Sequence, residues 1–147
     1  MTGDDEIESA AQRMRLRLGI DDQLRPDMIT VVFKLKDQGI IKDYVRVADS
    51  EMPDDEAKYD SFEKLLYLRE STFTAGNGMF PHSTSERRRA RYTIAHEVGH
   101  IALGHSGVRF RGGTAALAEK MVSRIRKEEY EANRFAAAFL APMYLAE

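Results

Sequence analysis

Apolar residues recur at helical spacing near the start of the chain. The pattern over residues 4–18 predicts a helix that ends at Gly19 and has an apolar face of Ile7, Ala10, Ala11, Met14 and Leu18. A second helix is predicted from Pro26 to Gly39, with an apolar face of Met28, Val31, Val32 and Leu35. The β-branched residues at 29–32 suit a strand equally well, so this segment has two interpretations.

The middle of the chain has the pattern expected of a small sheet. Strands are predicted at 44–47, around 58–62 and, more strongly, at 65–72, with an acidic, turn-rich stretch between the first two. Residues 75–83 are predicted to be a loop. The segment 65–72 is either an edge strand that pairs with an extended substrate or a plain core strand.

The last third of the chain carries the clearest helix signals. Ser83 and Glu86 form a capping box, which predicts a helix that runs to about Leu103, with Gly104 just past its end. A final helix is predicted over 118–140 and stops before Pro142. We expect a single α+β domain over residues 1–147, with N-terminal helices (1–40), a sheet and loop (41–80) and two C-terminal helices (83–142).

Composition narrows the class of protein. The chain has 147 residues, of which 31% are charged and 43% hydrophobic, as in an ordinary soluble globular protein. Its net charge of −2 gives no reason to expect nucleic acid or an anionic membrane as a partner. The first residues lack the apolar core of a signal peptide, and no apolar run approaches the roughly 20 residues that cross a bilayer. A cytoplasmic location is therefore expected.

Three of the four histidines lie in the stretch RYTIAHEVGHIALGH. His96, Glu97 and His100 form an HExxH pattern on a predicted helix, where residues i and i+4 share a face about 6 Å apart. Two imidazoles so placed can converge on one metal ion, while Glu97, about 100° around the helix, suits a general base better than a ligand. The alternative is an amphipathic helix with ordinary polar histidines, but the apolar neighbours favour a buried site.

A catalytic zinc site needs a third protein ligand. Because the chain has no cysteine, that ligand must be a histidine or a carboxylate. His105 is not expected to supply it, since on a continued helix it would point about 140° away from His100. A position at the helix end, where a cation favours the dipole, fits His105 better.

Acidic residues on the final helix offer better candidates for the third ligand. Glu129 and Asn133 lie one turn apart, so the glutamate can complete a His–His–Glu site and the asparagine can orient a ligand by a hydrogen bond. Glu128 and Glu131 are rival ligands. All three glutamates could instead form a solvated face, although the apolar run that follows them indicates that one side of this helix is packed.

Two linked stretches, RYTIAHEVGHIALGH and EYEANRFAAAFLAP, resemble the motifs of the ImmA/IrrE family of small zinc metallopeptidases in order and spacing. The family pattern is roughly R-[FY]-T-[IL]-A-H-E-[LV]-G-H, followed by E-x-E-A-N-x-F-A-A-x-L-L-x-P. The LYLREST segment and the N-terminal helices also look similar, so the resemblance covers most of the chain. Ala141 departs from the pattern, because the family usually has Met before the last proline.

The resemblance implies a thermolysin-like minimal zincin core, in which a small mixed sheet packs on the HExxH helix and on a second ligand-bearing helix. It implies one zinc ion bound by His96, His100 and Glu129, with Glu97 as the general base. Family members typically cleave a helix-turn-helix transcriptional repressor and so derepress mobile-element or stress-response genes. This chain is therefore expected to act on such a protein partner without binding nucleic acid itself.

Two questions stay open at the level of the sequence. The reaction needs an electrophile for the developing oxyanion, and Tyr92, Tyr130 and His82 are equal candidates. A competing function is a catalytically silent, zinc-containing protein that sequesters a repressor or an antitoxin. The two functions differ in whether Glu97 is needed beyond folding.

Overall fold

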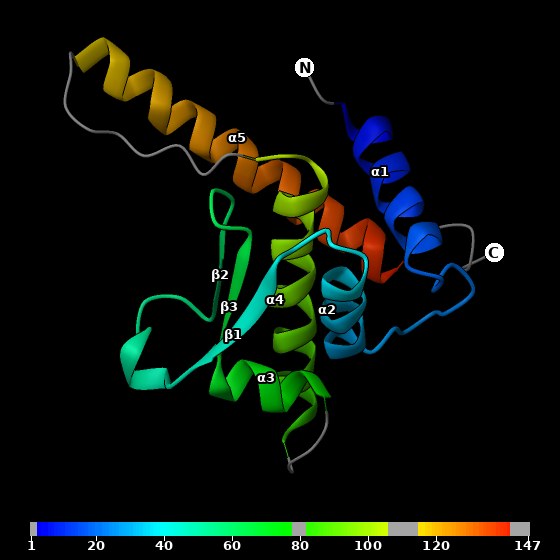
Figure 1. Cartoon of the computed structure of the whole chain (residues 1–147). Helices are drawn as coiled ribbons and strands as arrows, with labels where there is room; N and C mark the ends of the chain where they lie inside the picture. The colour runs from blue at the N-terminus through cyan, green and yellow to red at the C-terminus, as the bar shows by residue number, and fades with distance from the viewer. Residues whose placement is uncertain (1–2, 78–81, 106–114, 142–147) are drawn as a thin grey trace.

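The structure is a computed structural model that describes residues 3–77, 82–105 and 115–141. Within these residues it contains five α-helices, one short 3-10 helix and a three-stranded sheet, which confirms the predicted α+β class (Figure 1). In chain order the elements are α1 (Asp4–Arg17), α2 (Met28–Asp37), β1 (Asp43–Val47), η1 (Asp49–Glu51), β2 (Ala57–Asp60), β3 (Leu65–Arg69), α3 (Glu70–Asn77), α4 (Thr84–Ala102) and α5 (Ala115–Leu140).

The two N-terminal helices form where the apolar spacing predicts them. The segment with two interpretations is the helix α2, because Asp27 Oδ1 accepts hydrogen bonds from the N–H groups of Ile29 (2.9 Å) and Thr30 (3.2 Å). This cap outweighs the strand preference of the β-branched residues, of which Ile29, Val31 and Val32 face the core. Gly19 and Gly39 follow the helices with φ of +71° and +72°, the left-handed conformation that suits glycine.

A buried arginine joins the start of the chain to its last helix. Arg15 of α1 is fully buried and donates from Nη1 to the Phe139 carbonyl of α5 (2.6 Å). Its Nη2 donates to the carbonyls of Ile20 (3.0 Å) and Gln23. The guanidinium also lies 5.7 Å from the centre of the Phe139 ring. A buried charge is thus compensated by backbone carbonyls from two parts of the chain.

The sheet has the order β1–β3–β2, with β1 parallel and β2 antiparallel to β3. The segment expected either at an edge or in the core is therefore the central strand, and its interpretation as an edge strand is wrong. Leu66 and Leu68 of β3 are fully buried on one face of the sheet. The edge strand β2 is the one that contacts α4.

The strand predicted at 65–72 is confirmed as far as Arg69, where β3 ends and the helix α3 follows at once, so the predicted loop is wrong at residues 75–77. Residues 78–81 of that loop lie outside the described part of the chain. The Asp49 side chain of η1 accepts a hydrogen bond from the Ser71 N–H (3.1 Å), in the first turn of α3. Arg46 of β1 forms an ion pair with Glu70, the first residue of the helix. These contacts come from more than 20 residues away in the chain, so the local sequence does not reveal them.

The capping box that opens α4 is confirmed. Ser83 Oγ accepts from the Glu86 N–H (3.2 Å), and Glu86 Oε1 accepts from the Ser83 N–H (3.0 Å). Figure 1 shows α4 running through the middle of the molecule, with the sheet on one side and α1 and α2 on the other. The last helix, α5, begins a few residues before its predicted start and crosses α4, while its first half extends beyond the other elements.

One hydrophobic core connects these elements. It includes Ile94 and Val98 of α4, Phe135 and Phe139 of α5, and side chains from α1, α2, α3 and β3. The rings of Phe135 and Phe139 are stacked with centroids 5.5 Å apart. Within the described residues, no helix combines the length and apolar character needed to cross a membrane.

Candidate metal centre

Two helices bring three donor groups together. His96 and His100 lie one turn apart on α4, and their Nε2 atoms are 3.1 Å apart. Glu129 of α5 reaches both rings, with Oε2 at 2.8 Å from His96 Nε2 and Oε1 at 3.3 Å from His100 Nε2. Because α4 and α5 pack against each other, residues more than 25 positions apart in the sequence meet at one point.

The spacing of these atoms fits a small tetrahedral cation. Ligand atoms that lie 2.0–2.1 Å from a tetrahedral zinc ion are about 3.3 Å from one another. The three separations in this cluster range from 2.8 to 3.3 Å. Two imidazoles and one carboxylate are also the ligand types that zinc prefers in catalytic sites. Burial lowers the pKa of His100 to about 4, which favours the neutral ring that can donate a lone pair.

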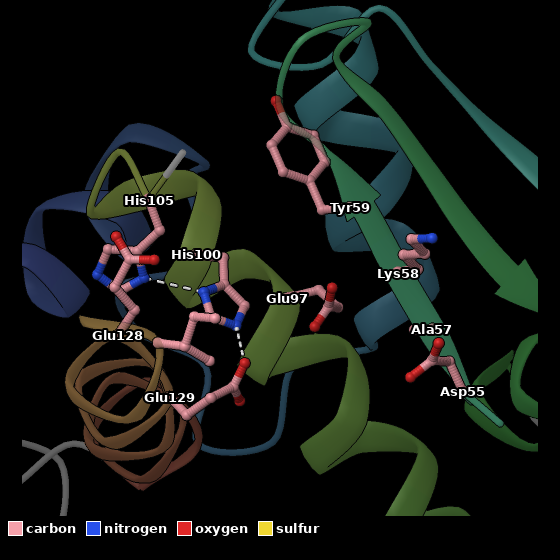
Figure 2. Close-up of a pocket in the computed structure, with 10 residues that line it drawn as sticks. Asp55, Ala57, Lys58, Tyr59, Glu97, His100, His105, Glu128 and Glu129 are labelled. Atoms are coloured by element: carbon pink, nitrogen blue, oxygen red, sulfur yellow. Dashed lines mark hydrogen bonds and ion pairs between the residues drawn. The ribbon is translucent and has the colours of Figure 1, made fainter. Parts of the chain in front are cut away.

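Glu97 lies beside these donors. Its carboxylate is 9% exposed, and Oε2 is 4.0 Å from His96 Nε2. Figure 2 shows the side chain between α4 and the edge strand β2, facing Tyr59 and Ala57. Burial and, to a lesser degree, the nearby Glu129 charge raise the pKa of Glu97 to about 8, while a hydrogen bond from the Tyr59 backbone opposes the rise. His96, Glu97 and His100 together form a group of donors within 4.8 Å of one another.

Of the three glutamates that competed as third ligand, Glu129 is the one that contacts both histidines. Glu128 lies 3.8 Å from Arg124 Nε, one turn earlier on α5. Glu131 is buried on a different side of the helix and contacts His105. The helical rotation of about 100° per residue separates the three side chains, so only one of them faces the histidine pair.

The family of the chain is decided by a comparison with protein-family models. The model of the peptidase M78 family, described as the IrrE N-terminal-like domain, matches residues 45–143. The chain belongs to this family. It is a family of zinc metallopeptidases, and the resemblance to ImmA/IrrE proteins is thereby confirmed. The match runs from β1 to the end of α5 and includes every residue of the cluster.

Comparisons with curated proteins and with solved structures found no match to the chain. As a metallopeptidase-family domain, it has a protein or a peptide as the expected class of substrate.

The M78 domain places His105 next to the cluster, although not where a continued helix would carry it. The ring is buried, with Nδ1 at 2.9 Å from His100 Nδ1 and Nε2 at 2.9 Å from Glu131 Oε1. His105 lies at the end of α4, as the sequence predicts, but its ring is buried against His100 and Glu131. Gly104, with φ of +67°, turns the chain back, so the His105 ring lies against His100 from the side opposite Glu129.

The three candidate electrophiles lie in different places. The Tyr92 hydroxyl donates to Asn133 Oδ1 (3.0 Å), and both residues line a hollow together with His96. The Tyr130 hydroxyl donates to Asp4 of α1 (3.1 Å), outside the two hollows that border the cluster. His82 contacts Thr74 (3.1 Å) and Glu86 (3.3 Å) at the opposite end of α4 from His96.

Within the described residues, the Asn133 side chain contacts Tyr92, whose hydroxyl donates to Oδ1, and not a histidine of the cluster. Asn133 lies one turn after Glu129 on the same face of α5, as the spacing predicts. What the sequence could not reveal is that Tyr92, one turn before His96, reaches across to the same face. The pair lines one of the hollows beside the cluster.

Two hollows meet at the cluster, and the edge strand β2 borders both. One, of about 300 Å³, includes Ala57, Tyr59, His100 and Glu129 in its lining (Figure 2). The other, of about 550 Å³, includes Ala57, Tyr92, His96 and Glu129. The sequence predicted a strand near these positions, but nothing in the local pattern indicated that it borders the histidines.

Proposed function

We propose that this M78 domain is a zinc-dependent endopeptidase in which His96, His100 and Glu129 bind the metal and Glu97 is the general base. The observation that carries the proposal is the convergence of two imidazole nitrogens and one carboxylate, with 2.8–3.3 Å between each pair of groups. They lie beside a cleft bounded by β2, which is an edge strand within the described residues. Asn133 supports the site indirectly, through Tyr92. The single-domain organisation over residues 1–147 is part of the same proposal.

The chemistry follows from the placement of Glu97. Bound zinc supplies Lewis acidity towards water and towards a peptide carbonyl. Glu97 is close to the donors without being one of them, and a cation bound beside it would favour its ionised form against the effect of burial. The carboxylate can then take a proton from the attacking water and deliver it to the leaving amine. Its confinement between α4 and β2 keeps the carboxylate oriented towards the cleft.

The edge strand β2 is suited to hold the substrate. It ends the sheet on the side of the cluster, and its residues Ala57 and Tyr59 line the cleft. An extended peptide can add to such an edge through backbone hydrogen bonds, which would hold the scissile bond near Glu97. This role replaces the one that the sequence suggested for β3, which is the central strand.

Tyr92 is the favoured partner for the developing oxyanion. Its side chain is 40% exposed and borders the larger hollow next to His96. The hydrogen bond to Asn133 orients the hydroxyl from the second helix. A hydroxyl held in this way can donate to an oxyanion once the substrate displaces the asparagine contact.

The proposed substrate is a helix-turn-helix transcriptional repressor, whose cleavage would derepress mobile-element or stress-response genes. Support for this comes from the family resemblance and not from a contact in the structure. The second candidate, a zinc-containing protein that only sequesters its partner, would use the same donors and the same cleft.

Metal content tests the site first. Elemental analysis of the purified protein should give about one zinc per chain, and Glu129→Ala should lose most of it, because one of three protein ligands is removed. Glu119→Gln, an exposed acid on the same helix, is the matched control and should retain the metal. Zinc retained in Glu129→Ala would show that a different residue is the third ligand.

Cleavage then separates the enzyme from the sequestering protein. Wild type and Glu97→Gln are incubated with purified helix-turn-helix repressors encoded beside the gene, and products are identified by mass spectrometry. We expect Glu97→Gln to bind zinc and partner but to cleave at least about 100-fold more slowly, as for loss of a general base. Full function of Glu97→Gln in cells would refute the enzymatic proposal and leave the sequestering protein.

A further inference from the structure

A chain of buried polar groups leads away from His100, on the side of the ring opposite Glu129. His100 Nδ1 lies 2.9 Å from His105 Nδ1, and His105 Nε2 lies 2.9 Å from Glu131 Oε1. The side chains of His105 and Glu131 are 6% and 7% exposed. Burying a histidine and a carboxylate costs free energy unless the two groups form a hydrogen bond with each other, so hydrophobic packing alone does not explain this arrangement.

The local backbone builds the first contact. The Gly104 N–H donates to the Ile101 carbonyl (3.3 Å), and the His105 N–H donates to the His100 carbonyl (3.0 Å). These two bonds, with Gly104 at positive φ, form the Schellman motif that ends α4. The turn directs residue 105 back over the last helical turn, where its ring meets the ring of His100.

The second contact depends on α5. Glu131 lies two positions after Glu129, about 200° around the helix, so the two carboxylates reach different parts of the same assembly. Glu129 contacts Nε2 of His100, while Glu131 contacts the histidine that touches Nδ1 of His100. Side chains of α5 therefore reach both ring nitrogens of His100, Glu129 directly at Nε2 and Glu131 through His105 at Nδ1.

Hydrogen-bond donors and acceptors can be assigned to the contacts between Glu131, His105 and His100. An ionised Glu131 can only accept, so His105 carries a proton on Nε2, and in the neutral ring Nδ1 is then an acceptor. His100 must then donate from Nδ1, which leaves its Nε2 lone pair free to face Glu129 and His96. The sequence of bonds selects the tautomer of His100 that can bind a metal through Nε2.

We propose that His105 and Glu131 are positioning residues that hold His100 in its Nε2-binding tautomer and orientation. The proposal rests on the proposed function, because it assigns His100 as a zinc ligand. His96 differs from His100, because its Nδ1 is buried and has no hydrogen-bond partner within the described residues. Positioning by a histidine–carboxylate pair is therefore a property of one ligand and not of both.

Zinc affinity, measured at pH 7 by competition with a chromophoric chelator, tests the proposal without any need for activity. Partners that orient a ligating histidine typically contribute 10- to 100-fold in metal affinity. We expect a loss in that range for His105→Leu and a smaller loss for Glu131→Gln, which keeps an acceptor but removes the charge. His105→Asn should recover much of the affinity, since the amide oxygen can occupy the place of Nδ1.

The exposed Glu119→Gln variant is the control and should bind zinc as wild type does. Because His105→Leu leaves the Glu131 carboxylate without its partner, this variant can fail to fold. His105→Asn and Glu131→Gln keep the test decisive in that case. If both residues act through His100, the double variant His105→Asn/Glu131→Gln should lose less zinc affinity than the sum of the losses in the two single variants.

The tautomer of His105 is a second readout, because hydrophobic packing alone would not decide which ring nitrogen carries the proton. In zinc-loaded, ¹⁵N-labelled protein, long-range ¹H–¹⁵N spectra should show His105 protonated on Nε2 and unprotonated on Nδ1. Protonation on Nδ1, or wild-type zinc affinity in folded His105→Leu and Glu131→Gln, would overturn the proposal. If wild type itself binds no zinc, the proposed function fails first, and the two failures are thereby distinguished.

Discussion

At the scale of single residues, Gly99 controls how closely the two site helices approach. It lies between His96 and His100 in sequence and is buried against α5. A methyl group at this position would lie 3.1 Å from Ala132 Cα, from the Ala132 carbonyl oxygen and from Phe135 Cβ. Two of these atoms are backbone of the helix that carries Glu129, so they cannot turn aside as a side chain can.

Gly99→Ala is therefore expected to push α5 away from α4. Overpacking should destabilise the protein by about 1–3 kcal/mol, even though alanine favours a helix over glycine. The displacement should also weaken zinc binding, because Glu129 moves with α5. Thermal unfolding and chelator competition measure the two effects.

Gly76 of α3 provides the matched control for this prediction. A methyl group there would meet the ends of the Ile94 and Ile29 side chains at 3.1–3.3 Å, and these ends can rotate. Gly76→Ala should be neutral or stabilise the protein by up to about 1 kcal/mol. Equal behaviour of the two variants would contradict the argument from backbone contact.

At the scale of elements, α5 is positioned by α1 as well as by α4. Arg15 connects the two helices through the Phe139 carbonyl, and Asp4 accepts from the Tyr130 hydroxyl further along the same interface. The helix that carries Glu129 is thus held by a helix that contributes no ligand to the proposed metal site. This helix lies outside residues 45–143, which the family model covers.

Arg15→Met tests the connection. Methionine has a similar length but no donor, so the buried carbonyls of Phe139 and Ile20 lose their partner, at about 1–3 kcal/mol each. We expect a total destabilisation of about 2–5 kcal/mol in chemical unfolding. Arg13→Met, an exposed neighbour on α1, should change the free energy of unfolding by no more than about 0.5 kcal/mol. A similar result for both arginines would refute the structural role of Arg15.

At the scale of the whole molecule, the proposed metal joins two helices that are separated in sequence and meet only through packing. His96 and His100 come from α4, which contacts the sheet, and Glu129 comes from α5, which contacts α1. A ligand that binds only the folded state stabilises it by mass action. Metal binding should therefore stabilise the whole fold and not just the site.

Removal of zinc with a chelator should lower Tm. With free zinc at 100 times Kd, the stabilisation is about 2.7 kcal/mol, which for a chain of this size corresponds to a shift of very roughly 5–10 °C. Glu129→Ala should melt at the same temperature with and without zinc. Magnesium, which prefers oxygen ligands, should not restore Tm. A Tm of the wild type that is independent of zinc would show that the cluster does not bind it.

The sequence by itself determined the local elements and the chemistry of the motif. The helices at both ends of the chain follow from apolar spacing, from the Ser83 capping box and from Gly19, Gly39 and Gly104, because these signals act within a few residues. The histidine pair with Glu97 follows from the helical repeat in the same way. The family follows from two motifs whose order and spacing are visible in the chain.

Only the tertiary structure decided which distant groups meet. The start of α3 depends on Asp49, the position of β3 at the centre of the sheet depends on β2, and Glu129 is distinguished from its neighbours by the rotation of α5 against α4. His105 lies at the helix end as predicted, but only the packing of α5 shows that its ring is a buried partner of His100 and Glu131. Contacts of this kind depend on how helices and strands pack, and packing joins residues that no local pattern relates.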